Sequence, residues 1–143
     1  MRLLGLDIGS SSIKAALVDA ATGKTLGAVQ APEREMDILA PYPDWAEQDP
    51  RVWWQNTCAA VQQLLHQTQT GPADVAAIGI SYQMHGLVAL DAAGDPVRPS
   101  IIWCDSRAVP VGDKAFRDLG EEHCLSHYLN SPGNFTASKL KWV

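Results

Sequence analysis

The first part of the chain alternates short apolar runs with polar turns. Two apolar runs, residues 3–8 and 13–18, flank the polar stretch Gly9-Ser-Ser-Ser12. This pattern predicts two strands joined by a tight turn. A turn signal at residues 19–23 and a strand-like run at residues 25–30 follow directly. We therefore expect a three-stranded antiparallel meander at the start of the chain.

The next periodic segment predicts a helix over residues 51–67. Its apolar side chains recur at spacings of three and four residues. Asp49 and Pro50 have the residue types preferred at the N-cap and at the first helical position. The run at residues 75–81 is continuously apolar, which is typical of a central strand covered on both faces. The expected apolar stripe of the helix comprises Trp54, Cys58, Val61 and Leu65, flanked by Trp53, Ala60 and Leu64, with both tryptophans in the core.

The remaining segments give weaker patterns. Residues 32–44 have no sustained period and are interpreted as irregular. Residues 87–103 are expected to form a second hairpin around the turn at 91–95. Helices are expected over residues 105–119 and 136–143, with Gly120 ending the first of them and a polar stretch between the two.

Composition narrows the class of protein. The chain has 143 residues, a net charge of −5 and no basic run that could follow a phosphate backbone, so nucleic acid is not an expected partner. It has no apolar stretch long enough to span a membrane and no signal-peptide pattern, so we expect a cytoplasmic location and no membrane partner. The three cysteines have no CxxC spacing, which argues against zinc and against a disulfide framework.

The stretch Asp7-Ile-Gly-Ser-Ser-Ser-Ile-Lys14 carries the first candidate chemistry. Gly9 permits a tight turn, and the amides and hydroxyls of Ser10, Ser11 and Ser12 would form a small concavity that suits phosphate. Asp7 could face a magnesium ion carried by a nucleotide, and Lys14 adds a positive charge. An ordinary Gly-Ser hairpin turn is the alternative, and no Walker motif is present.

The second candidate lies at the end of the predicted strand 75–81, in Gln83-Met-His-Gly86. Ligands tend to bind where such strands end. A histidine satisfied within the core is the alternative for His85, but its place beside Gly86 favours ligand contact. Asp105 could be a helix cap or a substrate residue. The histidines expected at the surface are His66, His123 and His127.

These stretches occur in a recognisable order. Asp7 to Lys14, Trp45-Ala-Glu-Gln-Asp-Pro50, Gln83 to Gly86, Ile102-Trp-Cys-Asp-Ser-Arg107 and Pro132 to Trp142 resemble the amino-terminal part of the FGGY family of carbohydrate kinases. Within that family, Gln83 to Gly86 is most similar to xylulokinases. The resemblance covers essentially the whole chain. Ser10 stands where the family more often has threonine, which keeps the hydroxyl.

The resemblance implies an incomplete actin-like (ribonuclease H-like) α/β domain: the meander, a crossover helix, a central parallel strand, and an inserted hairpin and helices. Residues 1–143 would be the first part of domain I of a kinase that phosphorylates D-xylulose to D-xylulose 5-phosphate, with ATP and magnesium. Asp7 would hold the magnesium ion. The implied phosphate residues are Gly9, Ser10, Ser11, Ser12 and Lys14, and the implied sugar residues are Gln83, Met84, His85, Trp103, Asp105 and Arg107.

One departure from the family is large. The catalytic base and the second phosphate loop of FGGY kinases lie beyond the position of residue 143, and phosphoryl transfer depends on both. We therefore expect this chain to be a fragment, inactive alone, that self-associates through an open sheet edge. The alternatives are a kinase for another sugar or polyol, such as ribulose, gluconate or erythritol, and a binding module without chemistry.

Overall fold

The computed structural model describes every residue from 1 to 143. The chain divides into two compact units. The first, which we call the sheet unit, comprises Met1–Asp37 and Pro50–Gln83. The second, which we call the helical unit, comprises Ile38–Asp49 and Met84–Val143. Each unit is therefore built from two separate stretches of the chain.

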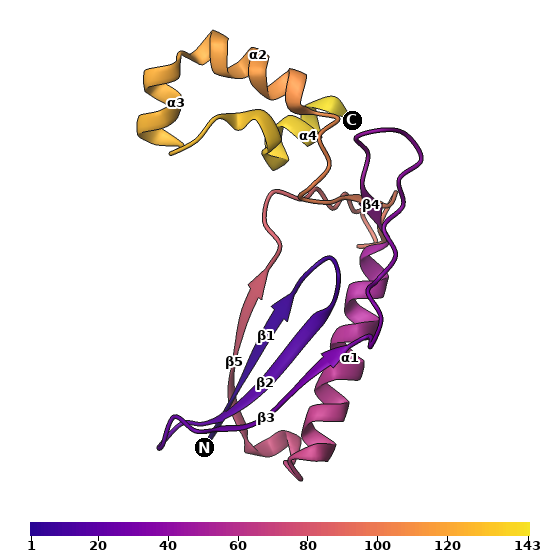
Figure 1. The fold of residues 1–143 in the computed structure, drawn as a ribbon, viewed down its shortest axis with the longest axis vertical. Coiled ribbons are helices and arrows are strands. Elements are labelled where there is room, and N and C mark those ends of the chain that lie inside the picture. The colour runs from indigo at the N-terminus through magenta and orange to yellow at the C-terminus, as the bar shows by residue number, and fades with distance from the viewer. The chain divides into compact units, whose positions relative to one another are not determined.

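The sheet unit contains a four-stranded mixed sheet (Figure 1). β2 pairs antiparallel with both β1 and β3, and β5 pairs parallel with β1. The order across the sheet is β3-β2-β1-β5. The predicted meander and the parallel strand after the helix are thereby confirmed. The strands are β1 (Arg2–Ile8), β2 (Ile13–Asp19), β3 (Thr25–Ala31) and β5 (Val75–Tyr82).

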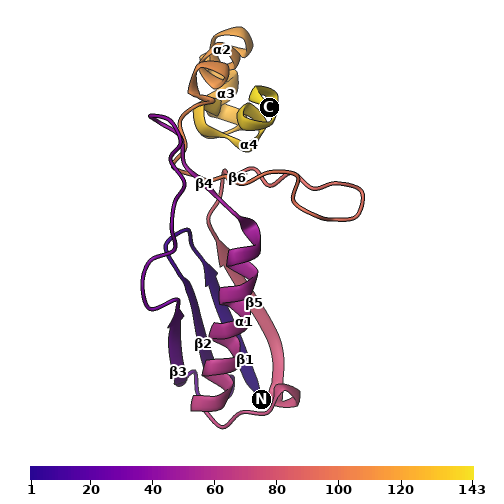
Figure 2. The same cartoon turned by 90° about the vertical axis from the view of Figure 1, so that its right-hand side faces the viewer.

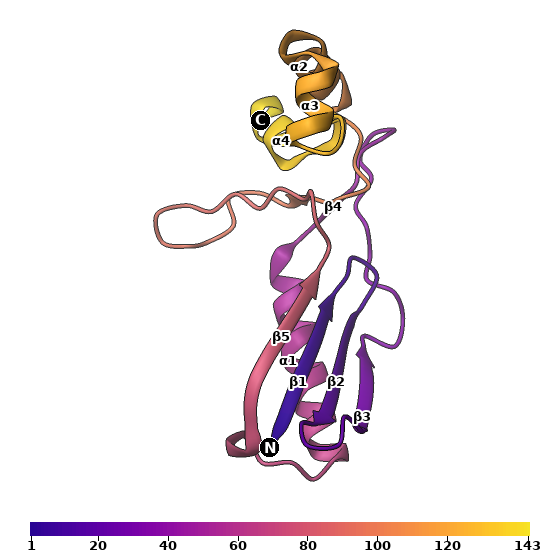
Figure 3. The same ribbon diagram turned by 90° about the vertical axis from the view of Figure 1, so that its left-hand side faces the viewer.

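Helix α1 (Pro50–Gln67) lies along one face of the meander, as Figures 2 and 3 show from opposite sides. Side chains alternate between the two faces of a strand, so every second residue of β1 and β2 points towards α1. These residues and the inner face of α1 form the core of the unit. Its fully or nearly fully buried members include Leu4, Leu6, Ile13, Ala15, Leu17, Ala60 and Leu64.

The buried face of α1 differs from the predicted stripe. Thr57, Ala60 and Leu64 are buried and Trp53 packs against the core, whereas Trp54 is 70% exposed. The prediction that both tryptophans belong to the core is therefore wrong for Trp54. The true face includes a polar residue, Thr57, whose hydroxyl donates to the carbonyl of Trp53 at 2.7 Å. A stripe chosen from apolar residues alone is displaced by one position, which is about 100° around a helix.

Strand β5 is one of the two outer strands of this sheet. Ile78 and Ile80 are each 59% exposed, and Tyr82 is 67% exposed. Helix α1 packs chiefly on β2 and β3, and every residue of β5 except Val75 is exposed. The expected burial on both faces is not seen within residues 1–143, because no strand pairs with the second edge of β5 and no helix covers it. A short 3-10 turn, η1 (Pro72–Asp74), leads into this strand.

The helical unit combines a very short sheet with three helices. β4 (Glu47–Gln48) pairs antiparallel with β6 (Ser100–Ile101), a pairing that the sequence did not predict. The expected second hairpin is confirmed in outline, although its arms meet only through isolated bridges, Leu87 to Ile101 and Leu90 to Pro96. The helical elements are α2 (Val109–Leu119), α3 (Glu121–His127), the 3-10 turn η2 (Pro132–Asn134) and α4 (Thr136–Trp142).

Two helical boundaries differ from expectation. Helix α2 begins at Val109 and not at residue 105, because Asp105 turns its side chain into the interior of the unit. The polar stretch after Gly120 forms α3, which the sequence did not predict. Gly120 ends α2 as predicted, with a φ of 91° that favours glycine. Helix α2 also packs tightly on η2, since a Cβ at Gly112 would overlap the backbone of residues 132–133.

The cysteines and histidines outside the candidate site have simple environments. Cys58, Cys104 and Cys124 are all free thiols, of which only Cys124 is buried. The three histidines expected at the surface are exposed, and no cluster of residues suited to a metal ion is found. None of the helices is long and apolar enough to cross a membrane.

Candidate functional site

The turn between β1 and β2 is held closed by its own backbone. The amide of Gly9 donates to the carbonyl of Ser12 at 3.1 Å. A Cβ at position 9 would lie only 3.0 Å from that same carbonyl oxygen, so this close approach favours glycine. Ser11 is exposed, and its carbonyl accepts from the amide of Met36 at 2.8 Å, which ties the turn to the following segment. The serine-rich turn is therefore a fixed feature of the sheet unit.

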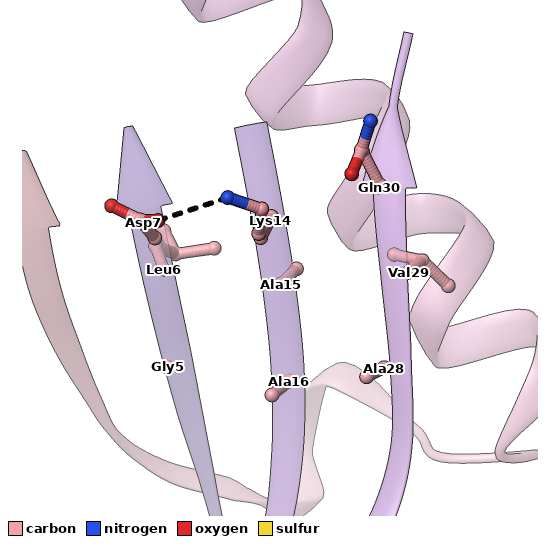
Figure 4. A pocket seen from close by; sticks show the side chains of 9 residues that line it. All are labelled: Gly5, Leu6, Asp7, Lys14, Ala15, Ala16, Ala28, Val29 and Gln30. Atoms are coloured by element: carbon pink, nitrogen blue, oxygen red, sulfur yellow. Dashed lines mark ion pairs between the residues drawn. The ribbon is translucent and has the colours of Figure 1, made fainter. Parts of the chain in front are cut away.

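Asp7 and Lys14 face each other where this hairpin begins. They are direct partners across β1 and β2, and the Lys14 Nζ lies 3.5 Å from Asp7 Oδ2 (Figure 4). Both side chains are at least half exposed, at 50% for Asp7 and 60% for Lys14. Gln30 is the next residue in the same row, on β3. One acidic, one basic and one amide side chain thus line the strand ends on the face opposite α1.

These three side chains border an open cavity of about 570 Å³ on the sheet face. Its floor is formed by small residues in the neighbouring row, Gly5, Ala16 and Ala28 (Figure 4). Carboxylate oxygens are the ligands that magnesium prefers, and an ammonium group offsets phosphate charge. The donor set therefore fits a nucleotide phosphate with its magnesium ion, with Asp7 as the metal-facing group and the tight turn at Gly9 beside it.

Gln83 extends the pairing of β5 with β1. Its amide donates to the carbonyl of Ile8 at 3.0 Å, which brings the end of β5 beside the start of the serine turn. Both atoms of its side-chain amide are buried and have no hydrogen-bond partner. An unpaired buried amide is costly, so a polar partner at this position would be favourable.

Met84, His85 and Gly86 follow directly and belong to the helical unit. Met84 is 62% exposed and His85 is exposed as well. His85 has a φ of 66°, a left-handed conformation that residues other than glycine rarely adopt. Its ring stacks on Phe135 with 4.9 Å between ring centroids and 11° between planes. A Cβ at Gly86 would lie 3.3 Å from the carbonyl of Ile101, so this turn passes close to β6.

Trp103 is the third exposed candidate of the helical unit. Its residue is 51% exposed, and its carbonyl accepts from Asn134 Nδ2 at 2.5 Å. Residues 134–136 thus contact both candidates, because Phe135 stacks on His85 and the Thr136 hydroxyl donates to the carbonyl of Gly86 at 3.0 Å.

Asp105 and Arg107 differ from the other candidates because they are buried. Asp105 is fully buried, and its carboxylate accepts from the Arg107 side chain at 2.6–2.9 Å and from the amide of Ala46 at 2.6 Å. Arg107 also donates to Glu47 at 2.7 Å. Its guanidinium carbon lies 3.6 Å from the ring centroid of Trp45 and 5.2 Å from that of Trp142. Every charged atom of the pair is therefore satisfied within the helical unit.

The charge states of this pair follow from those contacts. Burial alone would raise the pKa of Asp105, but hydrogen bonds from Arg107 and from the amide of Ala46 outweigh burial and lower it. Burial alone would lower the pKa of Arg107, but hydrogen bonds to Asp105 and Glu47 raise it. The pair is thus ionised at neutral pH.

Comparison with known proteins identifies the family. Residues 2–143 match the model of the FGGY family of carbohydrate kinases, N-terminal domain. The chain belongs to the FGGY family of carbohydrate kinases. The xylulose kinase of Escherichia coli (strain K12) is 37% identical over 141 residues, which cover 98% of this chain and 28% of that protein. The glycerol kinase of Paracidovorax citrulli is 34% identical over 144 residues, which cover 99% of this chain and 28% of that protein.

A solved structure agrees with the sequence comparison. A protein described as a xyloylose kinase from Brucella ovis superposes with a TM-score of 0.86 at 36% identity, covering 100% of this chain and 29% of that one. The predicted actin-like α/β fold, incomplete in residues 1–143, is confirmed for this FGGY chain. The chain spans 28% of the length of the curated relatives it matches.

The structure groups the predicted site residues of this FGGY chain by unit. Residues 7–14 and Gln83 lie in the sheet unit, and Met84, His85, Trp103, Asp105 and Arg107 lie in the helical unit. Within the sheet unit, the ends of β1 and β5 bring Asp7, the serine turn and Gln83 to adjacent strand ends. Within the helical unit, residues 134–139 join the backbones of His85 and Trp103.

Sequence reasoning assigned no role to several residues of the helical unit. Trp45 and Glu47 hold Arg107, and Lys139 is fully buried beside His85. All three lie in stretches that carry the FGGY resemblance, so that resemblance was the available signal. Their contacts join positions more than 50 residues apart, which local patterns do not reveal.

Proposed function

We propose that residues 1–143 are the N-terminal part of an FGGY kinase that transfers a phosphoryl group from ATP to D-xylulose, forming D-xylulose 5-phosphate. The observation that carries the proposal is the 37% sequence identity to the xylulose kinase of Escherichia coli, which extends over 98% of this chain. The remainder of domain I and all of domain II would come from further sequence, and the working enzyme would be cytoplasmic.

The sheet unit would hold the nucleotide. Asp7 would face magnesium, and the turn from Gly9 through Ser10 and Ser11 to Ser12 would approach the phosphates, with Lys14 offsetting their charge. The half-exposed Asp7–Lys14 pair and the close approach at Gly9 support this assignment. Bound magnesium would supply charge neutralisation at the transferring phosphoryl group.

The helical unit would hold the sugar. Met84, His85 and Trp103 are exposed and would contact the ketose. Asp105 and Arg107 would support the sugar site indirectly, because their charged atoms are buried and already paired with each other. They would fix the segment that carries Trp103.

In the reaction, an oxygen of the sugar forms a bond to the γ-phosphorus while the bond from that phosphorus to the ADP oxygen breaks. The hydroxyl proton passes to a carboxylate that residues 1–143 would not supply, because Asp7 is assigned to the metal. Positioning and electrostatics provide most of the catalysis in such transfers. The part of the work done by this chain would be to hold both substrates.

A second candidate is a kinase for another sugar or polyol. The glycerol kinase relative, at 34% identity over 99% of this chain, supports this alternative. Glycerol is smaller than xylulose. The two candidate functions therefore differ in which substrate the exposed side chains of the helical unit would bind more tightly.

A substrate panel tests the proposal. The whole protein that contains this segment would be assayed for ADP release with D-xylulose, D-ribulose, gluconate, erythritol and glycerol. We expect the largest kcat/KM with D-xylulose, and a kcat about a hundred- to a thousandfold lower in Asp7→Ala. A preference for glycerol would favour the second candidate, and no turnover with any member of the panel would overturn the assignment as a kinase.

A further inference from the structure

Lys139 of helix α4 is a buried lysine without an ion-pair partner. Lys139 is 0% exposed. Its Nζ donates to two backbone carbonyls, that of His85 at 2.8 Å and that of Asn134 at 3.2 Å. None of the ion pairs of the structure includes it. A lysine in this setting is rare, because its charge loses water without gaining a carboxylate.

The burial of Lys139 has a measurable cost. Desolvation lowers the pKa of its ammonium group, an effect that the charge of Asp105 partly opposes. Its two hydrogen bonds to backbone carbonyls offset part of this cost, because each carbonyl gains a charged donor. A methionine would fill a similar volume without a buried charge, but it would hold neither carbonyl.

Lys139 binds the carbonyl of His85, a residue with an unusual backbone conformation. His85 has a left-handed backbone, which is sparsely populated for residues with a side chain and costs roughly 1–3 kcal/mol unless the surroundings fix it. The ammonium of Lys139 fixes its carbonyl, the hydroxyl of Thr136 fixes the carbonyl of Gly86, and the ring of Phe135 supports the imidazole from one side.

The second carbonyl that Lys139 binds is that of Asn134, which in turn contacts Trp103. Asn134 accepts from Lys139 through its carbonyl and donates through its side-chain amide to the carbonyl of Trp103. One ammonium group therefore connects the backbones that carry His85 and Trp103, two exposed side chains from segments 18 residues apart in sequence.

We propose that Lys139 is a positioning residue for sugar binding, which fixes the left-handed turn at His85 and, through Asn134, the segment of Trp103. The inference rests on the proposed function, since it assumes that these side chains meet the sugar. It assigns Lys139 no contact with the substrate. Its loss would therefore weaken sugar binding and leave nucleotide binding nearly intact.

The test compares Lys139→Met with Lys141→Met in the whole kinase. Both substitutions remove one positive charge from α4, but Lys141 is exposed and makes neither hydrogen bond. We expect Lys139→Met to raise the KM for D-xylulose about ten- to a hundredfold, as for the loss of hydrogen bonds to a charged group. The KM for ATP should change less than about threefold, and Lys141→Met should resemble the wild type.

Thermal melting separates positioning from packing. We expect Lys139→Met to shift the melting temperature little, because relief of a buried charge offsets the loss of two hydrogen bonds, while it weakens sugar binding. A packing role would not produce this combination. Thr136→Val removes the exposed hydrogen bond to Gly86 and should raise the sugar KM about threefold, even if Lys139→Met fails to fold.

The outcomes separate the inference from the proposed function. A wild-type protein that phosphorylates no sugar would overturn the proposed function, and the role of Lys139 with it. An active wild type whose Lys139→Met variant keeps its sugar KM within twofold, or loses sugar and ATP binding equally, would overturn the inference alone. So would a Thr136→Val variant identical to the wild type if Lys139→Met does not fold.

Discussion

The sheet unit and the helical unit bury different kinds of side chain. In the sheet unit, apolar residues of β1, β2 and α1 meet in one core, and no charged side chain is buried. The helical unit buries four charged residues, Glu47, Asp105, Arg107 and Lys139, among few large apolar ones. Buried charges need particular partners at particular distances, whereas apolar side chains need only volume. The difference suggests that the sheet unit is built for stability and the helical unit for fixed geometry.

Substitutions in the two units should also affect catalysis differently. Asp7→Ala in the whole kinase should lower kcat roughly a hundred- to a thousandfold, because the residue is assigned to charge stabilisation at the transferring phosphoryl group. The KM for D-xylulose should change little. In the other unit, His85→Ala should raise the sugar KM about tenfold with a smaller effect on kcat. Steady-state kinetics with each substrate varied would check both, and exchanged profiles would show that the assignments are reversed.

The two kinds of core can be broken separately. Arg107→Met leaves Asp105 buried without its ion-pair partner and leaves Glu47 with Arg98 alone, which should cost about 3–5 kcal/mol. Leu64→Ala in the sheet unit should cost about 2–5 kcal/mol through the cavity that it leaves. Hydrogen exchange measured by mass spectrometry should show faster exchange in residues 38–49 and 84–143 for the first variant and in residues 1–37 and 50–83 for the second. Equal opening of both units by either variant would mean that they do not unfold independently.

Acid should affect the helical unit more than the sheet unit. The pKa of Asp105 is lowered in the folded chain, so its contribution to stability is present above its unfolded pKa of about 3.9 and is lost as the pH falls through the lower, folded value. We expect the tryptophan fluorescence of the helical unit, where Trp45 and Trp142 lie beside Arg107, to change below about pH 4.

A variant provides the control for the acid experiment. Asp105→Asn has no carboxyl at this position, so it should be less stable at neutral pH and should lose this part of the acid dependence. An unchanged acid transition in Asp105→Asn would assign the transition to other carboxyl groups.

Exposed apolar residues of the two units should differ in their tendency to associate. Strand β5 presents an unpaired edge with exposed Ile78 and Ile80, so the 143-residue chain alone should form dimers or larger species. Ile80→Lys should reduce this association, whereas Val97→Lys in the helical unit, at the same 59% exposure, should not. Light scattering at micromolar concentrations measures both, and a monomeric wild-type chain would contradict the expectation.

The sequence predicted the sheet unit well because its signals are local. Two apolar runs around a polar turn predicted β1 and β2, and Asp49-Pro50 with the helical period over residues 51–67 predicted α1 to within one residue. The helical unit was predicted poorly because its decisive contacts are distant in sequence. Asp105 was expected as a helix cap or a substrate contact, but it accepts from the amide of Ala46, 59 residues earlier. The site residues came mainly from the family resemblance, and the supporting Lys139 was not found because its partners are backbone carbonyls.

The division of the helical unit between two stretches of chain also affects its synthesis. Glu47 is made 51 residues before Arg98 and 60 residues before Arg107, its two partners. At about 5–20 residues per second, Arg107 follows after roughly 3–12 seconds. The core between the meander and α1 needs little beyond Gln67 and can close first on the ribosome. Translation speed, and not equilibrium stability, then sets how long residues 38–49 stay open to chaperones and proteases.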